Sequence, residues 1–555
     1  MIYDSWVLAD PPLTEPHIPV ANETLRGIFA RRGVTDEDGY RRFITPSLDD
    51  LHDPSSIHGM DHACERIGRA IRDHEAIVIY GDYDVDGVTS IVLLQTVIRS
   101  LGGNVGFVVP QRLVDGYGLK MEVLERVLID RDVKLVVTVD CGITSIEPVQ
   151  RAIERGIDVI ITDHHLPPGT LPEAAAVLNP KQPGCTYPFK ELAGVGVAFK
   201  LCCELIRRSG RKISIESLLK IAAIGTIADV APLTGENRAI ARLGLDGLAD
   251  TRNHGLRALL RRLGLHGRPL RAADVGFKIG PRINAAGRLA SADTAIDLFA
   301  AASEEAAWSI CSELDRMNSE RQQIEATVRD AATRQIGGDE RILILAGEGW
   351  HRGVLGLAAG RIAQQWHRPT LVMSIDGDRC VGSGRSIRTV NLHEALETVS
   401  DLFTHFGGHE FACGFAFPAD RLPHLRERLQ AHFDAMSAAL FDRHVVMDGW
   451  LTLSEIDRDF IAAHELLQPF GAANDQPLFG IRRARVTARR LFAEDCCELS
   501  VEDGSGTGSA VVWPSVKQLA SGAEGEALDL LVRVEPDSWS PTGGRLVLAD
   551  VRSAE

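Results

Sequence analysis

The stretch AIVIYGDYDVDGVTS, residues 76–90, decides how this chain begins to fold. Its first five residues are apolar and rich in isoleucine and valine, which predicts a buried strand, and a helix over residues 88–101 is predicted to follow. Between the two lie Asp82, Asp84 and Asp86. The chain is therefore expected to pass from strand to helix through a short loop that carries three carboxylates.

Two more strands are predicted on the same plan, LVVTV at residues 135–139 and DVIIT at residues 158–162, with a helix near residues 146–155 between them. Repeated strand, helix and strand units predict a parallel sheet with right-handed crossovers. The second strand runs into Asp140, and the third runs into Asp163, His164 and His165. In open α/β sheets this end of the strands is where ligands bind.

The residue types at these strand ends favour a metal site. Carboxylates this close repel one another unless cations neutralise them, and carboxylate oxygen with imidazole nitrogen suits manganese and similar ions. Asp229 is a further candidate, because it is the single acid in the apolar stretch AAIGTIADVAPL and a buried carboxylate is costly unless it is paired or coordinated. An ordinary surface loop is the structural alternative, but the first loop lies beside two other acid-bearing strand ends.

A site with two divalent ions, held by a bridging aspartate, would acidify a water molecule and stabilise the attacking and leaving oxygens of an in-line phosphoryl displacement. The reaction class that this predicts is hydrolysis of a phosphate ester or anhydride.

Other stretches predict further domains. Residues 291–335 have apolar residues at helical spacing, which predicts a long connecting helix. From Arg341 the strands RILILA and TLVMSI begin a second, smaller α/β region, and after about residue 440 short alternating runs predict a small antiparallel barrel. The expected domains are an N-terminal segment (1–55), a parallel-sheet catalytic domain (56–235), a helical connector with a phosphate-binding segment (236–335), a substrate-binding α/β domain (336–438) and a nucleic-acid-binding barrel (439–555).

Composition limits the class of protein. With 555 residues the chain can form several cores, its ten cysteines suggest a reducing cytoplasm, and no apolar run is long enough to span a membrane. A net charge of −16 argues against nonspecific coating of nucleic acid. Residues 252–271 carry six arginines and no acid, which fits either a solvated helix face or a local basic groove.

The motifs GDYDVDG, VDCG, TDHH and GTIAD, in this order, resemble those of the DHH phosphoesterase family. The resemblance implies two divalent metal ions, manganese or magnesium. It implies catalytic roles for Asp140, the expected bridge, and for His164 and His165, of which His165 contacts the scissile phosphate or the leaving group. The implied metal ligands are Asp82, Asp84, Asp86, Asp140, His164 and Asp229, with Asp86 either a ligand or a partner of one.

The second α/β region resembles the DHH-associated domain through GWHRGVLG, SGRS and GGHEFACG. In that family glycine-rich backbone approaches the substrate closely, and the arginine of SGRS reaches a phosphate. The positions that match are Ser383, Arg385, Gly407, Gly408 and His409. The stretch departs from the family pattern at Phe411 and Cys413, where small residues are expected, and this departure bears on local packing.

Two more stretches, GPRINAAGRL (280–289) and LLQPFGAANDQPLF (466–479), resemble the RecJ family of exonucleases. This resemblance implies substrate binding by Arg282, Asn284 and Arg288, with a terminal 5′ phosphate held by the arginines. It implies a monomeric, cytoplasmic exonuclease that degrades single-stranded DNA to mononucleotides from the 5′ end, acts in DNA recombination and repair, and has single-strand-binding protein and a RecQ-type helicase as partners. Aromatic residues such as Tyr117 are candidates for stacking on bases.

Three other functions would fit part of this sequence pattern. Another DHH hydrolase would act on short oligonucleotides, cyclic dinucleotides or pyrophosphate, but such chains tend to lack the barrel. A non-catalytic adaptor of the same fold would have lost metal ligands, and all of the expected acids and histidines are present. A dinucleotide-binding oxidoreductase would need G-x-G-x-x-G after its first strand, which is absent.

Overall fold

The computed structural model describes residues 2–112, 114–116, 118–128, 132–493, 496–520, 525–540 and 542–554. The chain forms two compact units. The larger unit is Leu51–Phe441, and the smaller one, called here the barrel unit, joins Met1–Asp50 to Asp442–Glu555. No helix among the described residues is long and apolar enough to cross a membrane.

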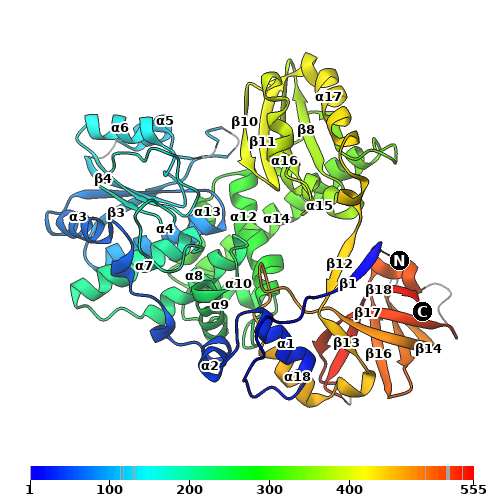
Figure 1. Cartoon of the computed structure of the whole chain (residues 1–555). Coiled ribbons are helices and arrows are strands. Elements are labelled where there is room, and N and C mark those ends of the chain that lie inside the picture. Colours follow the sequence, from blue (N-terminus) through cyan, green and yellow to red (C-terminus); the bar gives the residue numbers. More distant parts are fainter. Residues whose placement is uncertain are drawn as a thin grey trace. The chain divides into compact units, whose positions relative to one another are not determined.

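The first part of the larger unit, residues 51–300, is called here the parallel-sheet lobe. Its five strands are all parallel, in the order β3-β2-β4-β5-β6, and Figure 1 shows α5 and α6 on one face of the sheet and α4 and α7 on the other. The strands are β2 (Ala76–Gly81), β3 (Asn104–Val108), β4 (Val133–Val139), β5 (Asp158–Thr162) and β6 (Ala176–Leu178). Because both faces are covered, β2 and β4 are buried almost throughout, as their continuous apolar runs predict.

Helices make up the rest of this lobe. They are α3 (Met60–Arg72), α4 (Val85–Ser100), α5 (Met121–Leu128), α6 (Ile146–Glu154), α7 (Gly194–Ser209), α8 (Ile215–Ala228), α9 (Gly235–Leu248), α10 (His254–Arg262), α11 (Ala272–Asp274), α12 (Gly280–Leu289) and α13 (Asp293–Ala300). A π-helical turn, Val275–Ile279, joins α11 to α12. Helix α4 begins three residues before its predicted start, because Asp84 caps it.

The predicted helical stretch 291–335 is two helices. Helix α13 ends at Ala300, and α14 (Glu304–Thr333) is capped by Ser303, whose hydroxyl accepts a hydrogen bond from the Ala306 N–H. Its 30 residues form the connecting helix that the apolar spacing predicts. The break follows from N-cap chemistry, since a serine followed by two glutamates is a strong helix start.

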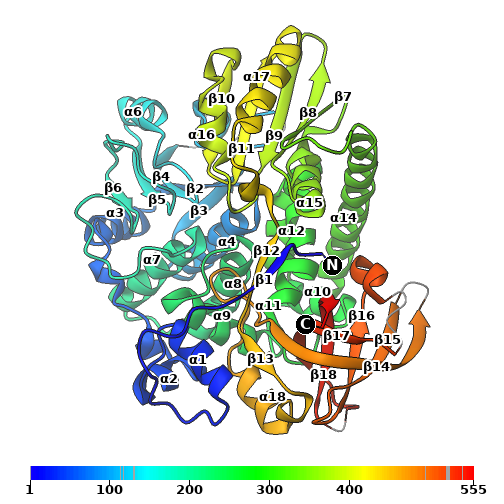
Figure 2. The same cartoon turned by 45° about the vertical axis from the view of Figure 1, so that its right-hand side comes forward.

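The mixed-sheet lobe, residues 343–441, follows α14 within the same unit. Its sheet has the order β10-β11-β9-β8-β7, and only the pairing of β7 with β8 is parallel. Its elements are β7 (Leu343–Glu348), α15 (Leu355–Trp366), β8 (Thr370–Asp376), β9 (Arg379–Arg385), α16 (Leu392–Glu397), β10 (His405–His409), β11 (Ala412–Pro418) and α17 (Leu422–Asp434). Figure 2 shows α15 and the pair α16 and α17 beside this sheet.

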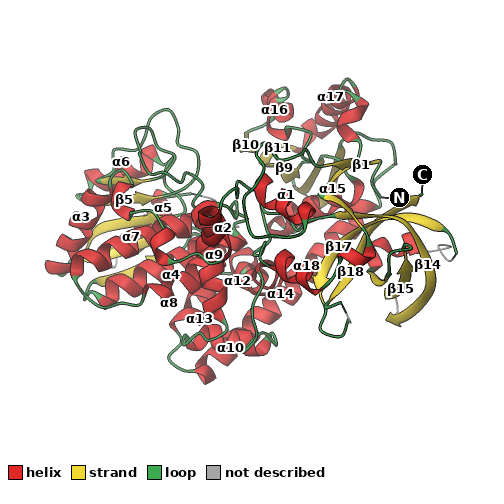
Figure 3. Cartoon of the chain, turned by 60° about the horizontal axis from the view of Figure 1, so that its bottom comes forward, coloured by secondary structure: helices red, strands yellow, loops and turns green. Residues whose placement is uncertain are grey.

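The barrel unit is built on five strands that close on themselves, in the order β14-β15-β16-β18-β17 with β17 paired back to β14. The strands are β14 (Phe479–Ala493), β15 (Cys496–Glu502), β16 (Thr507–Val512), β17 (Ala527–Pro536) and β18 (Gly544–Ser553), and Figure 3 shows their strong curvature. The predicted antiparallel pattern holds except between β16 and β18, which are parallel. Closure needs this pairing, because the chain leaves β16, forms β17 and returns as β18.

The N-terminal segment folds with the barrel, a feature that no sequence motif indicates. Strand β1 (Ser5–Leu8) pairs in parallel with β12 (His444–Met447), and the buried Asp550 carboxylate accepts hydrogen bonds from the Ile2 and Tyr3 amides and the Trp6 indole. The remaining elements of this unit are α1 (Glu23–Arg31), α2 (Glu37–Ile44), β13 (Gly449–Leu451) and α18 (Arg458–Glu465). The predicted fold class, an α/β chain with a parallel sheet, a connecting helix, a smaller α/β region and a C-terminal barrel, is confirmed.

Candidate metal centre and phosphate site

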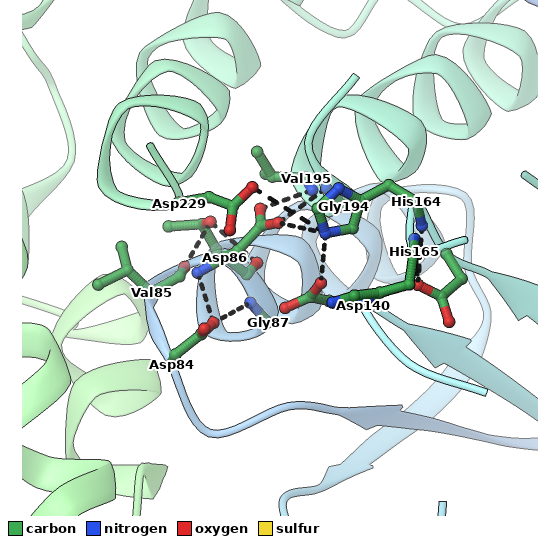
Figure 4. A network of polar contacts seen from close by, with 12 residues as sticks. Asp84, Val85, Asp86, Gly87, Asp140, His164, His165, Gly194, Val195 and Asp229 are labelled. Atoms are coloured by element: carbon green, nitrogen blue, oxygen red, sulfur yellow. Dashed lines mark hydrogen bonds and ion pairs between the residues drawn. The ribbon is translucent and has the colours of Figure 1, made fainter. Parts of the chain in front are cut away.

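The predicted strand-end residues converge at the carboxyl ends of β2, β4 and β5 (Figure 4). Three groups of side chains each place one ligand atom per residue within 4.8 Å of the others. The groups are Asp82 with Asp84 and Asp140, Asp86 with His164 and Asp229, and Asp140 with His164 and His165. Asp140 and His164 each occur in two groups, so the sets form one continuous centre.

The loop Asp82–Asp86 is called here the acid loop, and hydrogen bonds to the start of α4 fix its shape. Asp84 Oδ1 accepts from the Asp86 and Gly87 amides at 2.9 and 3.1 Å, which satisfies two free donors of the first helical turn. Asp82 is buried, and its Oδ1 has no hydrogen-bond partner among the described residues. The cap thus orients Asp84 while Asp82 offers an unused oxygen.

Asp86 is anchored differently from its neighbours. Its Oδ2 accepts from the Gly194 amide and its Oδ1 from the Val195 amide, both at 2.7 Å, so it lies on the positive N-terminal end of α7. Its Oδ2 is also 3.9 Å from Nε2 of His164. Asp86 therefore links the start of α4 to the start of α7, and its Oδ2 lies near His164.

Asp140 lies at the middle of the centre. It has φ +58°, a left-handed conformation that is uncommon for a residue other than glycine, and its amide donates to Thr162 O at 3.0 Å. Its buried Oδ1 has no hydrogen bond within the described part of the chain and lies 3.2 Å from Nε2 of His164, which has none there either. Strained backbone of this kind clusters at functional sites.

Asp163 orients the two histidines. Its Oδ1 accepts from the His164 and His165 amides and from Nδ1 of His165, the last at 2.7 Å, and its Oδ2 accepts from the Ile143 amide. Burial alone would raise the pKa of Asp163, but the hydrogen bond and charge of His165 hold it below its usual value. Asp163 is thus a buried anion that fixes the ring of His165.

Asp229 directly follows α8 and completes the centre, with Oδ2 4.0 Å from Nε2 of His164. Burial, followed by the charges of Asp86 and Asp84, raises the pKa of Asp229 to about 9. Burial and the charge of Asp84 raise the pKa of Asp86 to about 7.

The centre has the electrostatics of a cation site. Burial and neighbouring carboxylates also raise the pKa values of Asp82 and Asp140 well above normal. Burial and the charge of His165 lower the pKa of His164 to about 3, so its imidazole is neutral and can ligate a metal. Oxygens and a nitrogen without hydrogen bonds, held among crowded carboxylates, fit hard or borderline divalent cations such as Mg²⁺ and Mn²⁺.

A cluster of arginines, Arg112, Arg288 and Arg385, lies beside the acid loop. Arg112 stacks on the ring of Tyr83 at 5.1 Å. Burial of Arg385, and next the charge of Arg112, lowers the pKa of Arg385. The same two causes lower the pKa of Arg288 to about 10. Guanidinium groups that repel one another in this way fit a bound anion, and arginine binds phosphate with several donors at once.

Ser383 and the start of α15 lie beside Arg385 and complete a candidate phosphate site. Arg385 Nη1 donates to Ser383 Oγ at 3.0 Å. A Cβ added at Gly356 would lie 2.9 Å from Arg385 Nη2 and 3.0 Å from Ser383 Oγ, so the first turn of the helix lies close to both groups. This site therefore combines arginine side chains with the N-terminal turn of a helix, a common anion-binding arrangement.

Gly407 and His409 on β10 share a sheet face with Ser383 and Arg385, because their partners on β11, Gly414 and Ala412, pair in turn with Ser383 and Arg385. A Cβ at Gly407 or Gly414 would meet nothing within 4 Å, so this face is open there. Gly408 has φ +144° and no room for a side chain.

The departures from the family pattern at Phe411 and Cys413 fit without disruption. Phe411 is exposed in the two-residue turn between β10 and β11, and Cys413 is buried, its thiol donating to His409 O.

Two predicted substrate contacts have other partners. Arg282 pairs with Asp315 of α14 and donates to Lys278 O, away from the arginine cluster. Asn284 accepts from the Val85 amide at 3.1 Å. Of the GPRINAAGRL arginines, only Arg288 lies in the cluster.

The ion pairs of the arginine-rich stretch 252–271 favour a structural role for these arginines over a basic groove. Arg257 and Arg261 pair with Glu304, Arg262 pairs with Asp315, and Arg268 pairs with Asp274. Arg257, Arg261 and Arg262 therefore bind α10 to α14, and Arg268 binds the following loop to α11.

Sequence reasoning missed Arg112 and Gly194. Arg112 follows β3, the neighbour of β2 in the sheet, so sheet order would have indicated it. Gly194 shows no local signal, because its role depends on the approach of α7 to Asp86. The candidate stacking residue Tyr117 lies outside the described residues.

Comparisons with known proteins agree with this geometry. A family model described as DHH family, N-terminal domain, matches residues 76–226, a DHHA1 domain model matches 339–435, and a RecJ OB domain model matches 447–543. A crystal structure of RecJ in complex with Mn²⁺ from Thermus thermophilus superposes with a TM-score of 0.85 at 28% identity, covering 99% of this chain and 80% of that one.

The sequence is also similar to curated relatives. It is 38% identical over 464 residues to the single-stranded-DNA-specific exonuclease RecJ of Bacillus subtilis (strain 168), covering 81% of this chain and 57% of that protein, so the match spans little more than half of that relative. It is 36% identical over 520 residues to the protein of the same name from Dickeya dadantii (strain 3937), covering 88% of this chain and 89% of the relative. With this identity over nearly the whole of both chains, and with a parallel sheet, an associated domain and a barrel in the same order, the chain belongs to the RecJ family of DHH phosphoesterases.

Proposed function

We propose that this chain is a metal-dependent exonuclease that degrades single-stranded DNA to mononucleotides in the 5′-to-3′ direction. The observation that carries the proposal is the junction at Tyr83, where the arginine cluster meets the acid loop. A phosphate held by the arginines is thereby placed beside a cation site that can act on a neighbouring phosphodiester.

Two divalent ions, manganese or magnesium, are the cofactors that fit the centre. The residues that would hold them are Asp82, Asp84, Asp140, His164 and Asp229, with Asp140 shared and Asp86 contributing Oδ2. When bound, such ions acidify a water molecule and neutralise charge on the attacking and leaving oxygens. The family resemblance and the unused oxygens of Asp82 and Asp140 support this set.

His165 is the proposed proton carrier. Its Nδ1 is bonded to Asp163, so any proton that His165 exchanges with substrate moves through Nε2. Burial would lower the pKa of His165, but Asp163 raises it above its usual value. His165 is therefore suited to contact the scissile phosphate as a charged donor or to protonate the leaving oxygen.

In this proposal the arginine cluster explains why degradation starts at the 5′ end and why one nucleotide is released at a time. Arg112, Arg288 and Arg385, with Ser383, would bind the terminal 5′ phosphate, and the open face at Gly407 and His409 would lie along the nucleotide. A terminal phosphate fixed next to the metal centre leaves the first phosphodiester as the one within reach. One nucleotide would then be released in each cycle.

The barrel would bind a further stretch of the DNA strand. Strand β14 exposes Arg485, Arg489 and Phe492, and the ring of Phe492 packs edge-on against exposed Trp513. Basic and aromatic side chains together are typical of surfaces that bind single strands. We further propose, from the family, a cytoplasmic monomer that acts in recombination and repair, with single-strand-binding protein and a RecQ-type helicase as partners.

The test is degradation of single-stranded DNA labelled at either end, with Mn²⁺, Mg²⁺ or chelator. Wild type should release mononucleotides from the 5′ end, and both chelator and Asp140→Ala should abolish release, while the matched variant at exposed Asp420, Asp420→Ala, behaves as wild type. Turnover of dinucleotides alone would favour the small-substrate reading, and no turnover would favour the adaptor reading.

A further inference from the structure

Helix α12, which contains the GPRINAAGRL motif, contacts the acid loop. The first three residues of α4, Val85, Asp86 and Gly87, have amides with no partner within the helix. Asp84 Oδ1 accepts from the amides of Asp86 and Gly87. The remaining amide, that of Val85, donates to Oδ1 of Asn284, which is 199 positions further along the chain. Asn284 thus completes the cap of α4 from another helix.

The same helix turn fits tightly against the loop. A Cβ added at Gly287 would lie 2.3 Å from Tyr83 O, so α12 touches the loop backbone there. Val85 is itself 1% exposed, so its amide lies in the interior of this junction. The loop segment between Asp82 and Asp86 therefore takes its position from α12 at two points, Asn284 and Gly287.

The next turn of α12 reaches the phosphate site. Arg288 Nη1 donates to Gly353 O at 3.1 Å, and a Cβ at Gly353 would lie 2.5 Å from Arg288 O. One short helix therefore contacts both the acid loop and the mixed-sheet lobe, with Asn284 and Arg288 one turn apart.

We propose that Asn284 is a positioning residue of the divalent-ion centre, and not a direct contact of the DNA as the motif resemblance implies. Its side-chain oxygen fixes the Val85 amide between Asp84 and Asp86, and so sets where these carboxylates stand relative to Asp140. The inference rests on the proposed function, because it requires that the centre binds divalent ions.

The expected effect is on ion affinity. Partners that orient metal ligands typically contribute about 10–100-fold to metal affinity. Removal of the Asn284 oxygen should therefore weaken Mn²⁺ binding by about that factor, while the affinity for single-stranded DNA in chelator stays within about twofold of wild type.

The experiment is calorimetric titration of Mn²⁺ into the full chain without DNA, for wild type, Asn284→Ala and Asn284→Asp. The aspartate keeps an acceptor for Val85, so Asn284→Asp should bind Mn²⁺ no more weakly than wild type. Asn391→Ala is the matched control, because Asn391 caps α16 through a single bond to the Glu394 amide, far from the acids in sequence. It should leave Mn²⁺ affinity unchanged.

Gly287→Ala is a second, independent disturbance of the contact between α12 and the acid loop. It is used if the melting temperature of Asn284→Ala is too low for a titration. It should also weaken Mn²⁺ binding. If Asn284→Ala binds Mn²⁺ as tightly as wild type, the inference is overturned but the proposed function is not. If that variant cannot be titrated, wild-type Mn²⁺ affinity in Gly287→Ala has the same meaning. Loss of DNA affinity in chelator without loss of Mn²⁺ affinity would overturn it in favour of a substrate contact. Failure of wild type to bind Mn²⁺ would overturn the proposed function as well.

Discussion

The carboxylate of Asp86 rests on the first turn of α7, where Oδ2 accepts the Gly194 amide at 2.7 Å. The approach leaves no room for a side chain: a Cβ at Gly194 would lie 2.9 Å from Asp86 Oδ2 and 2.9 Å from both Cβ and Oδ1 of Asp140. Neither neighbour is a flexible chain end, since Asp140 belongs to the strained turn after β4. The packing of α7 against the acids thus shapes the metal centre.

Gly194→Ala should accordingly disable the centre while the fold survives. The added methyl displaces Asp140 and Asp86, and a misplaced metal site should lower hydrolysis of single-stranded DNA by about 100-fold or more. Gly196→Ala is the control on the same helix, because its Cβ would meet only the Leu192 side chain, at 3.2 Å. Wild-type turnover in Gly194→Ala would show that the acids tolerate displacement.

Asp140→Asn should stabilise the metal-free protein. The carboxylate of Asp140 is buried among other acids, which raises its pKa well above normal, so its charge destabilises the folded state at neutral pH. In chelator the variant should therefore melt at a higher temperature than wild type. With saturating Mn²⁺ the order should reverse, because only wild type gains the stabilisation that ligand binding confers. An unchanged melting temperature in chelator would contradict the electrostatic account of this site.

Strand-end chemistry made most of the metal centre predictable from sequence. Asp82, Asp140 and His164 follow apolar runs whose alternation with helical stretches predicts parallel strands, and parallel strands bring their carboxyl ends together. The anchoring of Asp86 by α7 was not predictable, because Gly194 acts through the close approach of two helices distant in sequence. Short-range patterns do not contain such tertiary contacts.

The sequence indicates only some of the residues of the candidate phosphate site, for a similar reason. The arginine of SGRS could be inferred, but Arg282 and Arg288 look equivalent within one motif. The structure separates them, since Arg282 pairs with Asp315 of α14 and Arg288 lies beside Arg112. Which face of a helix meets which neighbour is decided by packing, and the asparagine between them holds a backbone amide.

Arg288→Gln and Arg282→Gln should therefore differ in their effects. Loss of Arg288 should reduce the preference for 5′-phosphorylated over 5′-hydroxyl strands by about 10–150-fold, because a charge-assisted bond to phosphate contributes about 1.5–3 kcal/mol. Loss of Arg282 should lower the melting temperature through its broken pair with Asp315 and leave the preference intact. Competition between the two kinds of strand measures this directly, and equal losses of preference would contradict the assignment.

Val230→Gly should stabilise the fold. Val230 follows Asp229 with φ +60°, a left-handed conformation that is costly for a β-branched residue. Such strain costs about 1–3 kcal/mol. The substitution removes this strain, but glycine destabilises the fold by about 0.5–1 kcal/mol because it makes the unfolded chain more flexible. The free energy of unfolding should rise by about 1 kcal/mol. Val446→Gly, in the extended strand β12, should instead lower it, and denaturant unfolding of both variants would show whether the strain is real.

The double variant Arg485→Gln/Arg489→Gln should weaken binding of long single strands and spare short substrates. Both arginines are exposed on β14 of the barrel unit, and each phosphate contact on a single strand contributes about 0.7 to the slope of log affinity against log salt concentration. The slope in chelator should therefore fall by about 1.4, while hydrolysis of dinucleotides is unchanged. Arg72→Gln/Arg99→Gln removes the same charge from the parallel-sheet lobe and should keep the full slope. A slope unchanged by the β14 substitutions would mean that this strand does not contact the DNA, because net charge is the same in both double variants and only the place of the charge differs.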